Sequence, residues 1–221
     1  MLKLWGRSSS SNVQKVRWLC AELNIPYQQT EIGGPFGGNN EATYRALNPN
    51  GLVPTIEDDD FVLWESNAIL RYLCNKHQAR GNQLAIQRAG ELYPTEMRRR
   101  ADVDRWLDWG NTTMGPALLA AFWGLIRTPK DQRDTAAIAA SAKKTAECLA
   151  IIEQRLEGHD FICGKQLTLG DIPIAIHTYR WMNLPFENVD YQRPELPRVN
   201  AWYKRLTVRD PYRLSVMLPI V

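Results

Sequence analysis

The chain has 221 residues, enough for one large domain or two small ones. Apolar residues make up 44% and charged residues 23%, the balance of an ordinary globular protein with a sizeable core. The net charge of +3 is too mild to favour a nucleic-acid partner, and no apolar stretch is long enough to span a membrane. No signal peptide is visible, and the four cysteines are scattered without a CxxC pair, so we expect a cytoplasmic protein with reduced thiols and no metal site.

Strand and helix signals alternate along the first third of the chain. The short apolar segment 2–5 predicts a strand, and the apolar spacing of 12–24 predicts a helix that ends before Pro26. We expect further strands at 27–32, 52–56 and 61–64, and further helices at 41–47 and 65–77. The order βαβ-α-ββα predicts a mixed four-stranded sheet with helices on both faces, in a domain that spans 1–79.

The remainder of the chain has helical periodicity. Between residues 80 and 92 this periodicity fades, and we expect a linker there. Helices are then expected at 94–125, at 131–157, from 171 to about 183 and at 195–208, with Pro116 bending or dividing the first of them. The predicted fold is therefore an α/β domain followed by an all-helical domain over 93–221.

A hydroxyl-rich turn, Ser8 to Asn12, separates the first strand from the first helix. Its side-chain oxygens and the free N–H groups of a helix start would lie at one place, which suits an anion. An ordinary helix cap would have the same composition.

Val53 and Pro54 begin a strand, where proline cannot donate a ladder hydrogen bond. If this peptide bond is cis, the Val53 backbone turns outward and can pair with an extended peptide. A trans proline at a sheet edge is the plain alternative, but the βαβ–ββα context favours the cis form.

Glu65 and Ser66 stand where a strand passes into a helix. Ser66 and the helix start can hold a carboxylate, while Glu65 can pair with an ammonium group. Together they would fit the α-amino acid end of a ligand. Further along, Thr168 and Asp171 have the spacing of a capping box, a structural feature of the helical domain.

Three motifs together carry a resemblance to a known family: Asn48-Pro49-Asn50-Gly51-Leu52-Val53-Pro54, Glu65-Ser66-Asn67-Ala68-Ile69, and Thr168-x-Gly170-Asp171-Ile172. Over its whole length the chain resembles the cytosolic glutathione transferases, with a thioredoxin-like domain and a helical domain. The opening, from Leu4 to Val16, is most similar to bacterial members related to the serine-type classes.

This resemblance implies glutathione as co-substrate, no prosthetic group, and a detoxifying transferase activity. Val53 would hold the cysteinyl part, Glu65 and Ser66 the γ-glutamyl end, and Asn39 with Asn40 the glycyl end. A homodimer is expected, with Asp102 or Asp104 of the partner subunit reaching the γ-glutamyl group.

The hydroxyl turn would then meet the sulfur of glutathione. Ser10 matches the position of the family's catalytic serine, while Ser9, Ser11 and Asn12 lie close enough to serve instead. An electrophile would bind beside the thiolate, in a pocket for which Trp109, Met114, Trp123 and Arg127 are candidates. For any one of the aromatic residues taken alone, core packing is the better explanation.

Two other functions fit the same residues. A glutathione-dependent disulfide or peroxide reductase would bind two glutathiones at the site, where a transferase binds one glutathione and one electrophile. A non-catalytic binding protein on the same fold would keep glutathione affinity when the serines of the turn are removed.

Overall fold

A computed structural model describes residues 1–221. The chain divides into two compact units. The first, called here the N-terminal unit, holds residues 1–95 and 211–218, and the second, the helical unit, holds residues 96–210 and 219–221. No helix combines the length and the apolar character needed to cross a membrane.

The N-terminal unit is built on a four-stranded sheet. Its strands are β1 (Leu2–Trp5), β2 (Tyr27–Thr30), β3 (Thr55–Asp58) and β4 (Phe61–Trp64), in the order β2-β1-β3-β4. Strand β1 is parallel to β2 and antiparallel to β3, and β3 is antiparallel to β4. The strand expected at 52–56 begins only at Thr55, because Pro54 has no N–H for the ladder.

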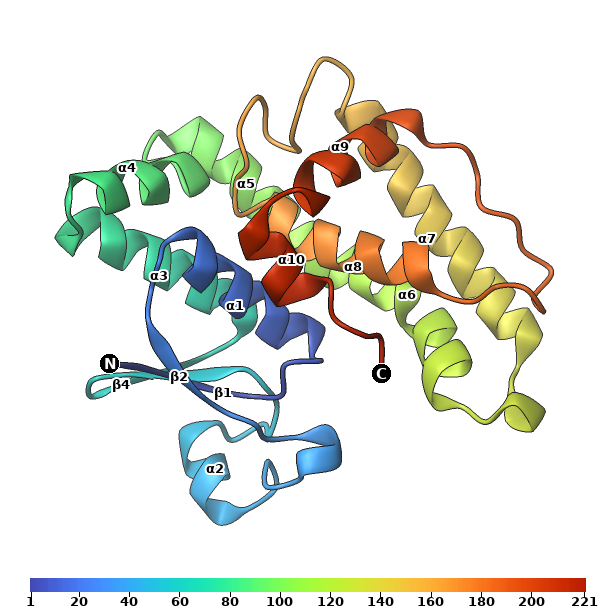
Figure 1. Ribbon diagram of the computed structural model, residues 1–221, viewed down its shortest axis with the longest axis horizontal. Coiled ribbons are helices and arrows are strands. Elements are labelled where there is room, and N and C mark those ends of the chain that lie inside the picture. The colour runs from blue at the N-terminus through green and yellow to red at the C-terminus, as the bar shows by residue number, and fades with distance from the viewer. The chain divides into compact units, whose positions relative to one another are not determined.

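Four helices accompany the sheet: α1 (Ser11–Glu22), α2 (Ala42–Leu47), α3 (Ser66–Arg80) and α4 (Gln83–Leu92), the last of which packs on α3. Helices α1 and α3 pack together over one face of the sheet, and α2 lies on the other face (Figure 1). The predicted order and the predicted mixed four-stranded sheet are confirmed, and this half of the chain has the thioredoxin-like fold.

Residues 80–92, expected as a linker, instead contain helix α4. Asn82 caps it by accepting a hydrogen bond from the Ala85 N–H at 3.0 Å, and Gln78 of α3 donates to the carbonyls of Ala89 and Tyr93. The expectation of an irregular segment is wrong because side chains of α3 supply the partners that hold α4 in place.

The C-terminal tail also departs from expectation. Helix α10 (Asp210–Val216) follows the helical unit in sequence, yet residues 211–218 belong to the N-terminal unit. Tyr212 packs edge-on against Trp18 of α1 with ring centroids 4.8 Å apart, and both side chains are fully buried. The tail thus completes the core of the first unit, although the expected helical domain included it.

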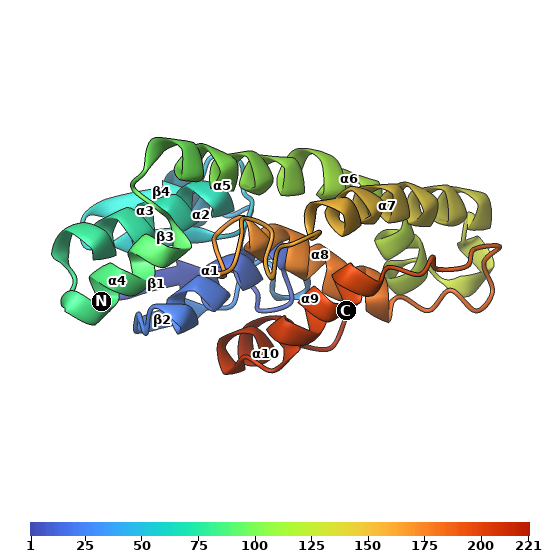
Figure 2. The same ribbon diagram turned by 90° about the horizontal axis from the view of Figure 1, so that it is seen from above.

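The helical unit contains α5 (Met97–Trp109), α6 (Gly115–Phe122), α7 (Thr135–Arg155), α8 (Asp171–Asn183) and α9 (Pro197–Thr207). Helices α5 and α6 follow one another along nearly one line, with α7 beside α6 (Figure 2). A π-helical turn at 110–114 separates α5 from α6 next to Pro116, as the expected division required. A second π-helical turn, at 123–127, follows α6.

The predicted capping box at Thr168 and Asp171 is present only in part. Asp171 accepts the Thr168 N–H at 2.9 Å, but the Thr168 hydroxyl donates to the Asp171 carboxylate at 3.1 Å instead of capping the helix. The other carboxylate oxygen accepts the Ile162 N–H at 2.8 Å and the Trp202 indole N–H at 3.0 Å. Asp171 is fully buried, so it joins a loop, α8 and α9 through one buried carboxylate.

Candidate functional site

Ser10 lies at the N-cap of α1 with an extended backbone, φ −74° and ψ 127°. Its carbonyl accepts the Gln14 N–H at 2.9 Å, but its hydroxyl makes no capping hydrogen bond. A serine at this position normally caps the helix. The hydroxyl and the first N–H groups of α1 are therefore available for a ligand.

The neighbouring serines differ from Ser10. Ser8 is committed to the protein, because its hydroxyl donates to Glu31 at 2.5 Å and accepts from Gln29 at 3.0 Å. Its N–H also donates to Glu31, at 3.0 Å. Ser11 is the first residue of α1 and is half-buried. The hydroxyl of Ser8 is thus part of the framework that fixes the turn.

The peptide bond between Val53 and Pro54 is cis, as the sequence predicts. The preceding loop is held by Tyr44 and Asn48, which both donate to the Leu52 carbonyl, at 2.7 and 2.8 Å. These buried contacts fix the backbone on the approach to Val53.

Gly6 allows Val53 to approach the start of α1. Its φ of +143° is rare for other residues, and an added Cβ would lie 2.5 Å from Val13 Cγ2 and 3.0 Å from Val53 Cβ. The glycine between β1 and the hydroxyl turn therefore brings the turn and the Val53 loop together.

Glu65 lies at the N-cap of α3 in a strained backbone conformation, φ 72° and ψ 109°. Such conformations cost about 1–3 kcal/mol and cluster at functional sites. Ser66 begins α3, is buried, and donates to the Asn12 side chain at 3.4 Å. The structure therefore places the γ-glutamyl candidates directly beside the hydroxyl turn.

Lys15 lies at the same place, although its position in the sequence does not indicate it. Its side chain is fully buried, and its Nζ donates to Ser66 Oγ at 3.3 Å. In sequence a lysine between Gln14 and Val16 indicates a solvent-exposed helix position. Only the packing of α1 against α3 shows that residues 13–16 are all buried.

Asn39 and Asn40 have other partners than those expected. Asn39 donates to the Gly51 carbonyl at 2.8 Å, and Asn40 accepts from Arg45 at 3.1 Å, so both amides brace the loop. The Arg7 side chain lies against the same loop, where an added Cβ on Gly34 would be 3.0 Å from it. Arg7 is a second basic residue that the sequence analysis overlooked.

The candidates in the helical unit have different environments. Met114 is fully buried, while Trp109 is half-buried and packs edge-on against Trp106 at 5.4 Å. Trp123 is 51% exposed, and the Arg127 guanidinium lies 5.1 Å above its ring. Trp123 and Arg127 form one amphipathic pair, whereas Met114 is a core residue within this unit.

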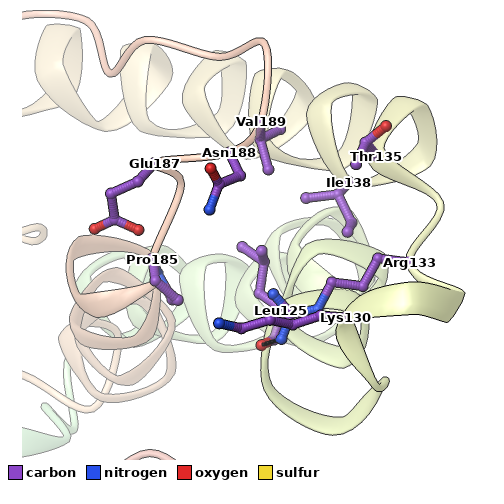
Figure 3. Close-up of a pocket in the computed structure, with 9 residues that line it drawn as sticks. All are labelled: Leu125, Lys130, Arg133, Thr135, Ile138, Pro185, Glu187, Asn188 and Val189. Atoms are coloured by element: carbon purple, nitrogen blue, oxygen red, sulfur yellow. Dashed lines mark hydrogen bonds between the residues drawn. The ribbon is translucent and has the colours of Figure 1, made fainter.

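A separate cavity of about 460 Å³ opens in the helical unit (Figure 3). Its lining comes from the second π-helical turn, the segment between that turn and α7, the start of α7 and the segment after α8: Leu125, Lys130, Arg133, Thr135, Ile138, Pro185, Glu187, Asn188 and Val189. None of the four expected electrophile-pocket residues is among them.

The cysteines stand apart from this chemistry. No cysteine lies in the hydroxyl turn, and all four are free thiols. Burial raises the pKa of Cys20 and of Cys163 to about 12, so neither supplies a thiolate near neutral pH. The functional groups at the turn are hydroxyls, an amide and a buried ammonium.

Comparisons with known proteins identify the family of the chain. Residues 9–76 match the family model of the glutathione S-transferase N-terminal domain, and residues 114–210 match that of the C-terminal domain. Glutathione S-transferase GstB of Escherichia coli strain K12 is 39% identical, over 100% of both chains. Glutathione S-transferase D7 of Drosophila melanogaster is 31% identical, over 86% of this chain and 82% of its own.

Among solved structures, the chain is similar to the theta class glutathione S-transferase of Xanthomonas axonopodis pv. citri with glutathione bound. The two are 43% identical, with a TM-score of 0.88, over 100% of this chain and 99% of the other. The chain therefore belongs to the glutathione S-transferase family of enzymes.

Proposed function

We propose that the enzyme binds glutathione in the N-terminal unit and conjugates it through its sulfur to a small hydrophobic electrophile, with the Ser10 hydroxyl stabilising the thiolate. The similar Xanthomonas structure is described with glutathione bound. In the reaction the thiol proton leaves to solvent, the sulfur forms a bond to carbon, and the leaving group departs with its electron pair.

The peptide would lie across the features that surround the hydroxyl turn. The backbone of Val53, beside the cis bond to Pro54, would pair with the cysteinyl residue. Glu65 takes the ammonium group and Ser66 the carboxylate of the γ-glutamyl end. The glycyl carboxylate faces the loop that Asn39 and Asn40 brace.

The observation that carries the proposal is the uncommitted hydroxyl of Ser10. A thiol with a pKa near 8.5 is only about 3% ionised at pH 7. One charge-assisted hydrogen bond contributes roughly 1.5–3 kcal/mol, enough to lower that pKa by about one to two units. Ser9, Ser11 and Asn12 remain alternative donors from the same turn.

The proposal extends to the second substrate and the assembly. The exposed Trp123 and its neighbour Arg127 would contact the electrophile, together with Trp109. A homodimer and a cytoplasmic location are part of the same proposal. Asp102 or Asp104 of the partner subunit would be the acid that reaches the γ-glutamyl group of glutathione.

Replacing Ser10 with alanine tests the mechanism. We expect Ser10→Ala to raise the pKa of bound glutathione by about one to two units and to slow conjugation of a chlorinated nitrobenzene at neutral pH by roughly tenfold to a hundredfold. Ultraviolet absorbance of the thiolate gives the pKa directly.

Ser8→Ala is the matched control, because that hydroxyl is already bound to Glu31 and Gln29. It should leave the thiol pKa unchanged. If Ser10→Ala also leaves it unchanged, the assignment to Ser10 is wrong, and Ser9→Ala, Ser11→Ala and Asn12→Ala identify the donor. If the enzyme reduces a glutathione mixed disulfide faster than it conjugates glutathione, the reductase function is established instead. Full glutathione affinity without turnover would establish a binding protein.

A further inference from the structure

The cavity of about 460 Å³ in the helical unit has no part in the proposed glutathione reaction (Figure 3). It opens at the π-helical turn 123–127, and such turns are rare and often lie at functional sites. Gly124 lets this turn approach α7 closely, because an added Cβ would lie 2.5 Å from Ile138 Cγ1. Small-molecule sites measure about 300–1,000 Å³, so the cavity has the size of a ligand site.

One arginine fixes each of two walls of the cavity. Arg133 donates to the Leu125 carbonyl at 2.7 Å and so ties the start of α7 to the π-helical turn. Arg193 donates to the Leu184 carbonyl at 2.7 Å, directly before the lining segment 185–189. The protein's own hydrogen bonds therefore hold both walls in place, as a preformed site requires.

The apolar part of the lining is aliphatic. It consists of Leu125, Ile138, Pro185 and Val189. Leu125 and Ile138 are buried, and Val189 points into the cavity (Figure 3). No aromatic ring is among the lining residues, so the cavity offers no ring on which a planar ligand could stack. These walls suit a saturated hydrocarbon chain.

The charged part of the lining is mainly basic. Figure 3 shows the nitrogen atoms of Lys130 and Arg133 on the same side of the cavity as Leu125. The Lys130 ammonium has no hydrogen-bond or ion-pair partner in the chain. The one acidic lining residue, Glu187, directs its carboxylate away from Leu125 and Ile138. An anionic group in the cavity would therefore meet two cations.

We propose that this cavity binds a straight-chain aliphatic carboxylate. The carboxylate pairs with the Lys130 ammonium beside Arg133, and the chain lies along Leu125, Ile138 and Val189. This site goes beyond the proposed function, since it uses neither the hydroxyl turn nor the residues assigned to the electrophile.

A series of ligands tests the chemistry of the site by titration calorimetry with the full chain, below the concentrations at which the acids form micelles. From hexanoate to octanoate to decanoate, affinity should rise about threefold to fourfold for each added methylene. Octan-1-ol, which has the same chain without the charge, should bind more weakly than octanoate. If the alcohol binds as tightly as the acid, or decanoate does not bind at about 1 mM, the inference is wrong.

Two substitutions test the location. Lys130→Gln should weaken decanoate binding about threefold to tenfold, because an exposed charge is partly screened. Val189→Trp should abolish it by filling the cavity. Lys143→Gln is the matched control, since Lys143 is an exposed lysine of α7 outside the lining, and it should bind decanoate like wild type.

Equal losses in the two lysine variants would mean that decanoate responds only to net charge, and the site would be wrong. If Val189→Trp fails to fold by circular dichroism, the comparison of Lys130→Gln with Lys143→Gln decides. Saturating S-methyl glutathione should leave decanoate binding unchanged. Displacement of decanoate would place the acid at the proposed glutathione site and overturn the inference.

Discussion

The helix starts at the proposed site differ from those of α5, α7 and α9 in the helical unit. In the helical unit Glu96 accepts two N–H groups of α5 at 2.9 Å, and Asp134 accepts one of α7 at 2.9 Å. Glu153, from α7, accepts two N–H groups of α9 at 3.0 and 2.9 Å. Helices α1 and α3 have no such acceptor from their N-cap side chains. Caps stabilise the scaffold, whereas uncapped starts keep donors for a ligand.

The buried charges repeat this contrast. The Asp171 carboxylate receives hydrogen bonds from Ile162, Thr168 and Trp202, all within the helical unit. Lys15 instead donates to the neutral hydroxyl of Ser66, at 3.3 Å. The buried carboxylate holds the helical unit together, whereas the buried ammonium lies at the proposed site.

The largest expected effect is the loss of Asp171. Asp171→Ala leaves buried donors of Ile162 and Trp202 without an acceptor, and we expect a loss of roughly 3–5 kcal/mol in unfolding free energy. Urea unfolding followed by circular dichroism measures it. Asp171→Asn, which keeps one acceptor oxygen, should lose less unfolding free energy. Equal urea midpoints for wild type and Asp171→Ala would show that the buried carboxylate does not stabilise the helical unit.

A smaller effect should distinguish the capped start of α7 from the uncapped start of α1. Asp134→Ala should cost about 1 kcal/mol of unfolding free energy, because it removes a cap, while Ser10→Ala should cost only a few tenths. The midpoints of urea unfolding compare the two directly. Equal losses would mean that the Ser10 hydroxyl stabilises α1, and the distinction between the two kinds of helix start would collapse.

The smallest effect concerns Tyr72, which donates to Asp58 at 2.7 Å beside Lys76. Burial, together with the hydrogen bond to Asp58 and its charge, raises the pKa of Tyr72 to about 12. Since the unfolded chain loses this proton near pH 10, the contribution is complete below about pH 10 and is lost as the pH rises toward 12. We expect about 1 kcal/mol or less, given partial solvent screening.

Tyr72→Phe isolates this dependence, because other tyrosines titrate in both proteins. The difference in urea midpoint between wild type and variant should shrink between about pH 9 and about pH 12. A constant difference would show that Tyr72 contributes packing, for example against Phe61 at 5.1 Å, and no proton linkage.

Much of the fold could be predicted because its signals are local. Alternating apolar residues marked the strands, Pro54 marked a cis bond before β3, and the π-helical turn before α6 lies beside Pro116. The expectation of a linker failed at α4 because the side chain that holds this helix, Gln78, belongs to the neighbouring helix α3. The periodicity of the sequence does not show a contact between two helices.

The site could be predicted only as a set of neighbouring residues. The sequence suggested that Ser10 and Ser66 belong to one site, and the structure brings their two helices together. The sequence could not show that Asn39 and Asn40 would form hydrogen bonds within the protein, or that Arg7 would lie against Gly34. Those contacts depend on the conformation of the glycine-rich loop.

By itself the sequence determined the order of elements, the cis proline and the motifs of the family, because turn chemistry and periodicity act over a few residues. Only the tertiary structure decided which hydroxyl is committed and which is open. Ser8 is bound by Gln29 and Glu31 from β2 and the residue after it, while Ser10, two residues on, has no such partner. It also turned Lys15 inward toward Ser66, because burial and hydrogen bonding depend on groups more than fifty residues away in the chain.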